Sequence, residues 1–220
     1  MKKALLIPIK DPERAKTRLA GLLSADERRA LACAMFEDVT RAVSFAHADM
    51  VAVVTTYEPA IERARKLGWE TLVEEAQSSE SASVDWASRR LAEMGFDAVM
   101  RLPADVPLVR AEDIDSLLRI DLPMPAALMV PSREGTGTNA IIRTPPCLFR
   151  SRFGPDSLAL HKAEATRVGV RCLIVENARI ALDIDEPADI RVLIESESDT
   201  ETRRLLVAMN VIVRMKNRQD

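Results

Sequence analysis

Alternation of apolar and polar positions divides most of the chain into short buried strands and amphipathic helices. Apolar runs, several of them rich in β-branched residues, predict strands at residues 4–9, 50–56, 69–74, 97–103, 126–132, 139–144 and 171–176. Apolar positions at helical spacing, with capping and breaking residues at the ends, predict helices at residues 25–43, 59–67, 84–94, 111–119 and 187–195. A further helix is expected to start in the FGPDS run and to end near residue 167, and residues 178–185 are expected to be extended.

The order of these elements predicts an α/β fold. Strand and helix alternate through the first half of the chain, which favours a mostly parallel sheet flanked by helices. The strands at 126–132 and 139–144 are separated only by REGTGT, which is too short for a crossover helix and indicates an antiparallel excursion. We therefore expect a single domain over residues 1–195. Residues 196–220 are expected to form a polar linker and a C-terminal helix whose docking the sequence does not predict.

Composition and charge restrict the class of protein. The chain has 220 residues, 47% of them hydrophobic and 30% charged, and a formal net charge of −3, which argues against a nucleic-acid-binding protein. No apolar run is long enough for a membrane span. Cys33, Cys147 and Cys172 are widely spaced and are expected to be buried, reduced thiols, so we expect a cytoplasmic protein.

A cluster of basic residues directly follows the first predicted strand. Lys10, Arg14, Lys16 and Arg18 lie within nine residues, and no glycine occurs before Gly21. In open α/β sheets, ligands bind at the carboxyl ends of the strands. A loop without glycine can hold phosphate through cationic side chains, so these residues form a candidate anion site, although a solvated loop face would look similar.

Three aspartates follow other predicted strands. Asp105 lies between two prolines just beyond the fourth strand, and Asp183 and Asp185 lie in LDIDEP. If residues 178–185 are extended, the period of two places Asp183 and Asp185 on the same side. Three converging carboxylates would suit Mg²⁺, whereas each aspartate alone is also typical of a helix cap or turn.

Two small turns and two histidines complete the candidates. GTGTNA at 135–140 and FGPDS at 153–157 carry hydroxyl groups, and Ser157 could cap a helix or help present backbone N–H groups to a phosphate. His47 and His161 have no neighbouring cysteine or serine arrangement, so we interpret both as structural or surface residues.

The motifs IPIK, AKTRL, LPADVP, GTNA, FGPDS and LDIDEP, in this order between residues 5 and 194, resemble the CofC/FbiD family of guanylyltransferases of coenzyme F-420 biosynthesis. The resemblance implies a single-domain nucleotidyltransferase-type fold related to molybdopterin guanylyltransferases. It also implies transfer of GMP from GTP to 2-phospho-L-lactate, phosphoenolpyruvate or 3-phospho-D-glycerate, with release of pyrophosphate.

Site residues follow from the same resemblance, motif by motif. The implied Mg²⁺ ligands are Asp105, Asp183 and Asp185. The residues implied to face the GTP phosphates are Lys10, Lys16 and Arg18, which leaves Arg14 as the solvated member of the basic loop. The residues implied to hold the acid are Thr138, Gly154 and Ser157. Whether the terminal helix builds a homodimer stays open.

One stretch departs from the family pattern. Between the third strand and the next helix the family commonly carries a glycine-rich run ending in Leu-Asn, whereas residues 78–85 read SSESASVD. An ionised Asp85 or Glu80 could accept hydrogen bonds from guanine N1–H and its 2-amino group. Asp85 is equally suited to cap the following helix.

Two other functions fit parts of the pattern. One is a nucleotidyltransferase for a sugar phosphate or a molybdopterin-like acceptor, which the small GTNA and FGPDS turns disfavour. The other is a non-catalytic nucleotide-binding regulatory module, which the three aspartates together with the basic loop disfavour.

Overall fold

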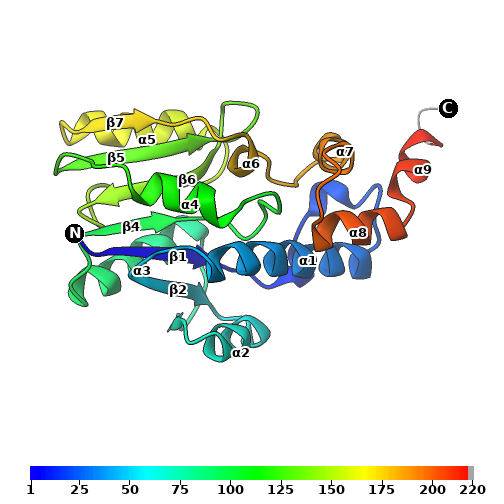
Figure 1. Cartoon of the computed structure of the whole chain (residues 1–220), viewed down its shortest axis with the longest axis horizontal. Helices are drawn as coiled ribbons and strands as arrows, with labels where there is room; N and C mark the ends of the chain where they lie inside the picture. The colour runs from blue at the N-terminus through cyan, green and yellow to red at the C-terminus, as the bar shows by residue number, and fades with distance from the viewer. Residues whose placement is uncertain (218–220) are drawn as a thin grey trace.

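The protein is built on one seven-stranded sheet of order β3-β2-β1-β4-β6-β5-β7 (Figure 1). The computed structural model describes residues 1–217, apart from the side chain of Arg14. The strands are β1 (Lys3–Pro8), β2 (Met50–Thr55), β3 (Glu70–Val73), β4 (Ala98–Arg101), β5 (Ala126–Pro131), β6 (Thr138–Thr144) and β7 (Arg171–Ile174). Only the pairings of β6 are antiparallel among the described strands, so the mostly parallel sheet with an antiparallel excursion is confirmed.

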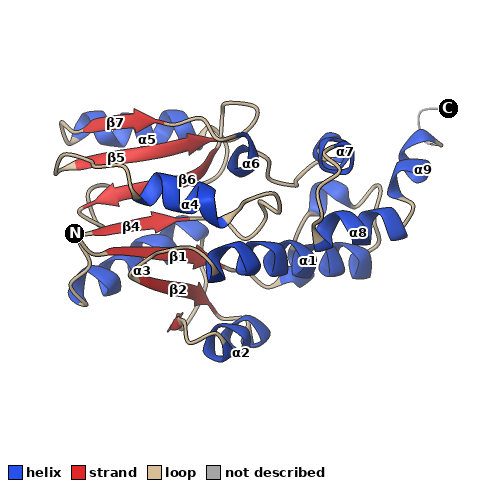
Figure 2. Cartoon of the chain, in the orientation of Figure 1, coloured by secondary structure: helices blue, strands red, loops and turns tan. Residues whose placement is uncertain are grey.

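Helices cover both faces of this sheet, and the last helices of the described chain lie beyond it, at the right of Figure 2. The helices are α1 (Ala25–Ser44), α2 (Glu58–Lys66), α3 (Glu80–Glu93), α4 (Ala111–Leu118), α5 (Ser157–Arg167), α6 (Ala178–Ala181), α7 (Pro187–Glu195), α8 (Glu201–Ala208) and α9 (Val211–Lys216), with 3-10 turns η1 (Pro12–Arg14) and η2 (Thr17–Leu19). A capping box starts α1, because Ser24 and Glu27 each accept a hydrogen bond from the other's backbone N–H.

Two predictions about the second half of the chain were wrong. Residues 178–185 do not form one extended segment. The Asn177 side chain caps the N–H groups of Arg179 and Ile180 and starts the short helix α6, and residues 182–185 belong to the loop that follows. The expected terminal helix is broken into α8 and α9 at Asn210, whose backbone is left-handed with φ of 53°.

Alternating strand residues fill a core on each face of the sheet. Leu5 and Ile7 of β1 pack with α1, α2 and α4 on one face. Ala4 and Leu6 point to the other face and pack with α3. There α5 covers the β5–β6 end of the sheet in a cluster that includes Met129.

A separate apolar cluster lies beyond the sheet, where α7, α8 and α9 meet the start of α1 at the right of Figure 1. Leu31 and Met35 of α1 pack there with Leu206 of α8. The Asp38 carboxylate on α1 accepts hydrogen bonds from the backbone N–H groups of Glu201 and Thr202 at the start of α8. Residues 201–216 are thus packed against α1 and are not a free extension.

The reversed direction of β6 has a consequence for the carboxyl edge of the sheet. Arg101 at the end of β4 is paired with Ile141, and Pro131 at the end of β5 with Thr138 at the start of β6. The first residues of β6 therefore lie at the same edge as the last residues of its neighbours.

None of the described helices is both long and apolar enough to cross a membrane. The three cysteines are free thiols, but Cys33 and Cys147 are exposed, so the expectation that all three are buried was wrong.

Candidate active site

Three carboxylates meet at the carboxyl edge of the sheet. Asp105 follows β4, and Asp183 and Asp185 lie on the loop between α6 and α7. Each offers an oxygen within 4.8 Å of an oxygen of the others. The loop brings both C-terminal aspartates to the cluster although they do not lie on a strand, and the Ile184 N–H donates to the Asp105 carbonyl at 3.2 Å.

Lys16 inserts its ammonium group into this cluster. Nζ lies 2.6 Å from Asp105 Oδ2 and 2.7 Å from Asp185 Oδ1, and only 8% of the side chain is exposed. Its backbone is left-handed, with φ of 54°, between η1 and η2. Burial alone would lower the pKa of Lys16, but the two carboxylates outweigh burial and hold the pKa above its ordinary value.

Asp183 is held by Asn139 of the GTNA run. Asn139 Nδ2 donates to Asp183 Oδ1 at 3.0 Å and to the carbonyls of Ile180 and Ala181. Burial, followed by the neighbouring Asp105 carboxylate, raises the pKa of Asp183 to about 6. The cluster therefore carries negative charge that Lys16 does not fully offset.

Two pockets meet at these carboxylates. The first, here called the hydroxyl pocket, has a volume of about 470 Å³ and is lined by Ser132, Thr138 and Ser157 among others. The second, here called the loop pocket, has a volume of about 370 Å³ and is lined by Lys16 and by apolar residues such as Pro12, Phe36 and Tyr57. The residues that line both are Glu80, Arg101, Pro103, Asp105 and Asp185.

The three residues implied to hold the acid lie together in the hydroxyl pocket. The backbone N–H of Thr138 donates to Ser157 Oγ at 2.9 Å, and the Ser157 N–H donates to the Gly154 carbonyl at 3.2 Å. Gly154 has φ of 123°, which side-chain-bearing residues rarely adopt. Ser157 is the first residue of α5, and its hydroxyl bonds to the start of β6 and does not cap its own helix.

The basic loop residues do not share one position. Lys10 lines the loop pocket, is exposed, and lies 3.9 Å from Glu80. Arg18 lines the hydroxyl pocket instead, with Nη1 3.8 Å from Asp185 and 3.7 Å from Glu186. The prediction for Arg14 falls on a side chain outside the described part of the chain.

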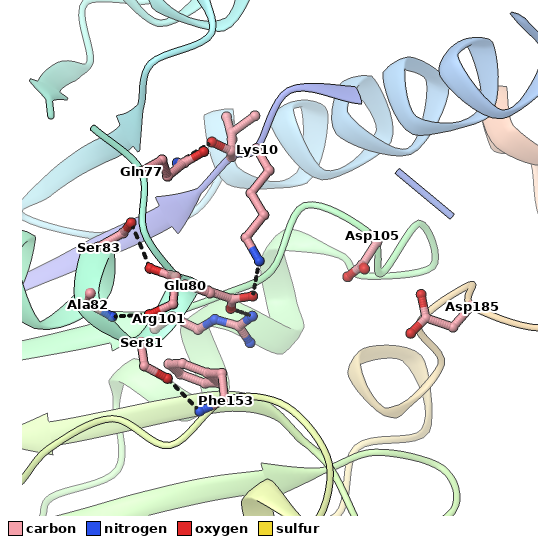
Figure 3. A network of polar contacts seen from close by, with 12 residues as sticks. Lys10, Gln77, Glu80, Ser81, Ala82, Ser83, Arg101, Asp105, Phe153 and Asp185 are labelled. Carbon is pink, nitrogen blue, oxygen red and sulfur yellow. Dashed lines mark hydrogen bonds and ion pairs between the residues drawn. The ribbon is translucent and has the colours of Figure 1, made fainter. Parts of the chain in front are cut away.

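Figure 3 shows a network that the sequence analysis did not identify. Arg101 of β4 is buried between the two pockets, with an ion pair to Glu80 at the start of α3 and hydrogen bonds to the carbonyls of Thr138 and Asn139. Its guanidinium lies 4.2 Å from the centre of the Phe153 ring. An arginine within an otherwise buried strand was the available signal, because such residues are rarely buried without a partner.

Asp85 does not lie in the cleft, and neither interpretation of it fits. It lies inside α3, whose cap is Ser79, so it is not a cap. Its carboxylate accepts from Arg143 Nη1 at 2.8 Å and from the Ser151 hydroxyl at 2.7 Å. The side chain neutralises a buried arginine of β6, and of the two candidate base-binding carboxylates only Glu80 lines the pockets.

The carboxylate cluster fits a divalent cation such as Mg²⁺. Hard oxygen ligands at close spacing are what this ion prefers. The pKa of Asp183 is raised first by burial and then by the neighbouring Asp105 carboxylate, and a bound cation would favour the ionised form of Asp183. Among the residues that line the hydroxyl pocket, carboxylates outnumber the two arginines Arg18 and Arg101. An anionic ligand there would need additional positive charge.

Comparison with solved structures defines the class of fold. A nucleotide-diphospho-sugar transferase structure from Desulfovibrio desulfuricans G20 superposes with a TM-score of 0.79 at 19% identity, covering 98% of each chain. A nucleotidyl transferase from Methanothermobacter superposes with a TM-score of 0.60 at 16% identity, covering 89% of this chain and 97% of the other. The fold is that of the nucleotidyltransferases.

Sequence relatives define the family within that class. The family model described as "Guanylyl transferase CofC like" matches residues 3–220, so the chain belongs to the CofC guanylyltransferase family. The phosphoenolpyruvate guanylyltransferase of Rubrobacter xylanophilus is 34% identical over 84% of this chain and 90% of its own length. The 3-phospho-D-glycerate guanylyltransferase of Colwellia psychrerythraea is 32% identical (88% and 91%), and the 2-phospho-L-lactate guanylyltransferase of Methanothermobacter thermautotrophicus is 31% identical (100% and 96%).

Proposed function

We propose that the protein transfers GMP from GTP to a small phosphorylated acid, with Mg²⁺ at the carboxylate cluster and release of pyrophosphate. The acid would be phosphoenolpyruvate, 2-phospho-L-lactate or 3-phospho-D-glycerate, the three acceptors that the names of the relatives give. A role in coenzyme F-420 biosynthesis is part of this proposal.

The position of Asp105 and Asp185 on the shared wall of both pockets is the observation that carries the proposal. A transfer between two anionic substrates needs both of them against one centre of positive charge. The apolar lining of the loop pocket suits a nucleoside, and the hydroxyl groups of the other pocket suit a small phosphorylated acid. We assign GTP to the loop pocket and the acid to the hydroxyl pocket.

The chain's own side chains supply position and charge in this scheme. The attacking phosphate oxygen of the acid is ionised at neutral pH, so the reaction needs no general base. Lys16 keeps its proton, because its pKa is raised, and therefore contributes charge and not proton transfer. Asn139 fixes Asp183 beside Asp105.

Asp105, Asp183 and Asp185 would hold the metal ion. When bound, Mg²⁺ would neutralise phosphate charge and align the two substrates. Lys16 bridges Asp105 and Asp185 and lines the loop pocket. Its ammonium group would therefore face the phosphates of a GTP molecule bound in that pocket.

The test is pyrophosphate release from four nucleoside triphosphates against the three acids, with Mg²⁺, and mass analysis of the product. We expect release with GTP and one of the acids, and a product that joins GMP to that acid. Release from no pair, or release that does not depend on the acid, would contradict the proposal and would favour a non-catalytic module or another acceptor class.

A further inference from the structure

Three hydroxyl groups of the hydroxyl pocket each accept a hydrogen bond from a backbone or ring N–H. Ser132 Oγ accepts from the Gly137 N–H, and Ser157 Oγ accepts from the Thr138 N–H, both at 2.9 Å. Thr138 Oγ1 lies 3.0 Å from Nδ1 of His161. A hydroxyl that accepts such a bond keeps its own hydrogen free to donate.

The polarity of the Thr138–His161 contact follows from the other side of the imidazole ring. The backbone N–H of Arg152 lies 2.8 Å from His161 Nε2, and a backbone N–H can only donate. Nε2 is therefore the acceptor nitrogen, so the hydrogen of the neutral ring is on Nδ1 and is donated to Thr138 Oγ1. The Thr138 hydroxyl has no other partner among the described residues, which leaves its hydrogen for a ligand.

The surroundings of His161 keep its imidazole ring neutral. The residue is fully buried on α5, and the Phe153 ring packs edge-on against it with ring centres 5.0 Å apart. Burial, together with the nearby positive charges of Arg143 and Arg101, lowers the pKa of His161 to about 4. A cationic ring would donate from both nitrogens and would break the contact with Arg152.

We propose that His161 is a positioning residue for the acid substrate, which turns the Thr138 hydroxyl into a fixed hydrogen-bond donor in the hydroxyl pocket. His161 does not line that pocket and acts only through Thr138. The inference rests on the proposed function, since it assigns the acid to the pocket that Thr138 lines. Ser157 and Ser132 present hydrogens in the same way, so the wall formed by these hydroxyls donates to an anion.

Two isosteric variants separate the two ring nitrogens. H161Q can keep an acceptor near Nε2 for the Arg152 N–H but loses the donor at Nδ1, whereas H161N can keep a donor near Nδ1. We expect H161Q to raise the KM for the acid about tenfold, as for weakening one hydrogen bond to a charged group, with the KM for GTP changed less than about twofold. H161N should keep the KM for the acid closer to that of the wild type.

The matched control is H47Q, because His47 is exposed and lies at the opposite edge of the sheet near Met1 and Lys3. It should leave both KM values unchanged. Equal rises of both KM values in H161Q, or a fall in kcat alone, would overturn the inference, because a merely structural histidine would act in that way.

A second measurement does not depend on activity. Long-range nitrogen–proton correlation spectra of the wild-type protein between pH 6 and 8 should show a neutral His161 ring protonated at Nδ1. A ring protonated at Nε2 would overturn the inference. If the wild type releases pyrophosphate with no acid, the proposed function fails, and the spectra alone then decide whether His161 holds the Thr138 hydroxyl in the donor state.

Discussion

The two pockets of the cleft are built by different halves of the chain and in different ways. The loop pocket is formed largely by residues 8–57, with lysines of the loop after β1 and apolar side chains of that loop and of α1. The hydroxyl pocket is formed largely by residues 132–157 and 183–189, with neutral hydroxyls and an excess of carboxylates. Asp105 and Asp185 belong to both.

This difference shows how one reversed strand adds a second pocket to a parallel sheet. Because β6 runs against its neighbours, Thr138 and Asn139 at its beginning reach the carboxyl edge, where parallel strands place their ends. A parallel strand at this position would place the GTNA run at the far edge. The hydroxyl wall of the cleft therefore depends on the short turn between β5 and β6.

The largest effect is expected where the pockets meet. Asp105→Asn should lower kcat by about a thousandfold, because it removes one carboxylate of the only such cluster among the described residues. Circular dichroism and thermal unfolding should show an intact fold. Asp121→Asn, at an exposed position, is the matched control; wild-type turnover in Asp105→Asn at saturating Mg²⁺ would remove this residue from the site.

The lysines of the loop pocket should differ from each other. Lys16→Ala should lower kcat by about a hundredfold, because it removes the buried ammonium that we propose to face the GTP phosphates. Lys10→Ala should change kcat less than about threefold, because Lys10 is exposed and its ion pair with Glu80, at 3.9 Å, is a weak one. Steady-state kinetics with GTP measure both, with Lys66→Ala at the exposed end of α2 as the control; equal losses would contradict the distinction.

The stability of the protein should depend on pH through His161, which holds Thr138 of the hydroxyl pocket. The pKa of His161 is about 4 in the folded protein and about 6.5 in the unfolded chain, so only the unfolded chain gains this proton as pH falls between these values. The stability that neutral His161 contributes is complete above pH 6.5 and is lost toward pH 4. From pH 6.5 to 5, the gap in unfolding free energy between wild type and H161N should shift by about 2 kcal/mol against the wild type.

Urea unfolding at the two pH values measures that gap. An unchanged gap would show that His161 titrates alike in both states, which would contradict the buried neutral ring.

The smallest effects should separate the substrates. Ser157→Ala removes the acceptor of the Thr138 N–H and should raise the KM for the acid about tenfold, with little change for GTP. Tyr57→Ala removes an aromatic wall of the loop pocket and should raise the KM for GTP by up to about tenfold, with little change for the acid. Initial rates with one substrate varied at a time give the two KM values. If each variant raised both KM values equally, the assignment of one substrate to each pocket would be contradicted.

Much of the parallel part of the fold could be predicted from local patterns. The strands β1, β2 and β4 are short apolar runs, and α1 and α7 begin at the predicted residues, 25 and 187. The position of β6 between β4 and β5 could not be predicted, because the pairing of β4 with β6 joins residues about 40 positions apart without a local signal.

The site shows the same limit. The proximity of Asp105, Asp183 and Asp185 was predicted from their place after apolar segments, but the physical reason given for the last two was wrong, because a short helix and a loop bring them together. Arg101, Asn139 and His161 were not assigned, since their roles come from contacts with distant carbonyls, carboxylates and hydroxyls. The ion pair of Asp85 could not be predicted, because its partner Arg143 is 58 positions away.

The most direct test of the division of the cleft is a crystal structure with a non-hydrolysable GTP analogue, Mg²⁺ and the preferred acid. We predict guanosine in the loop pocket beside Tyr57, the metal ion on Asp105, Asp183 and Asp185, and the acid against the hydroxyls of Thr138 and Ser157. The nucleotide in the hydroxyl pocket, or a metal ion bound away from these three carboxylates, would contradict it.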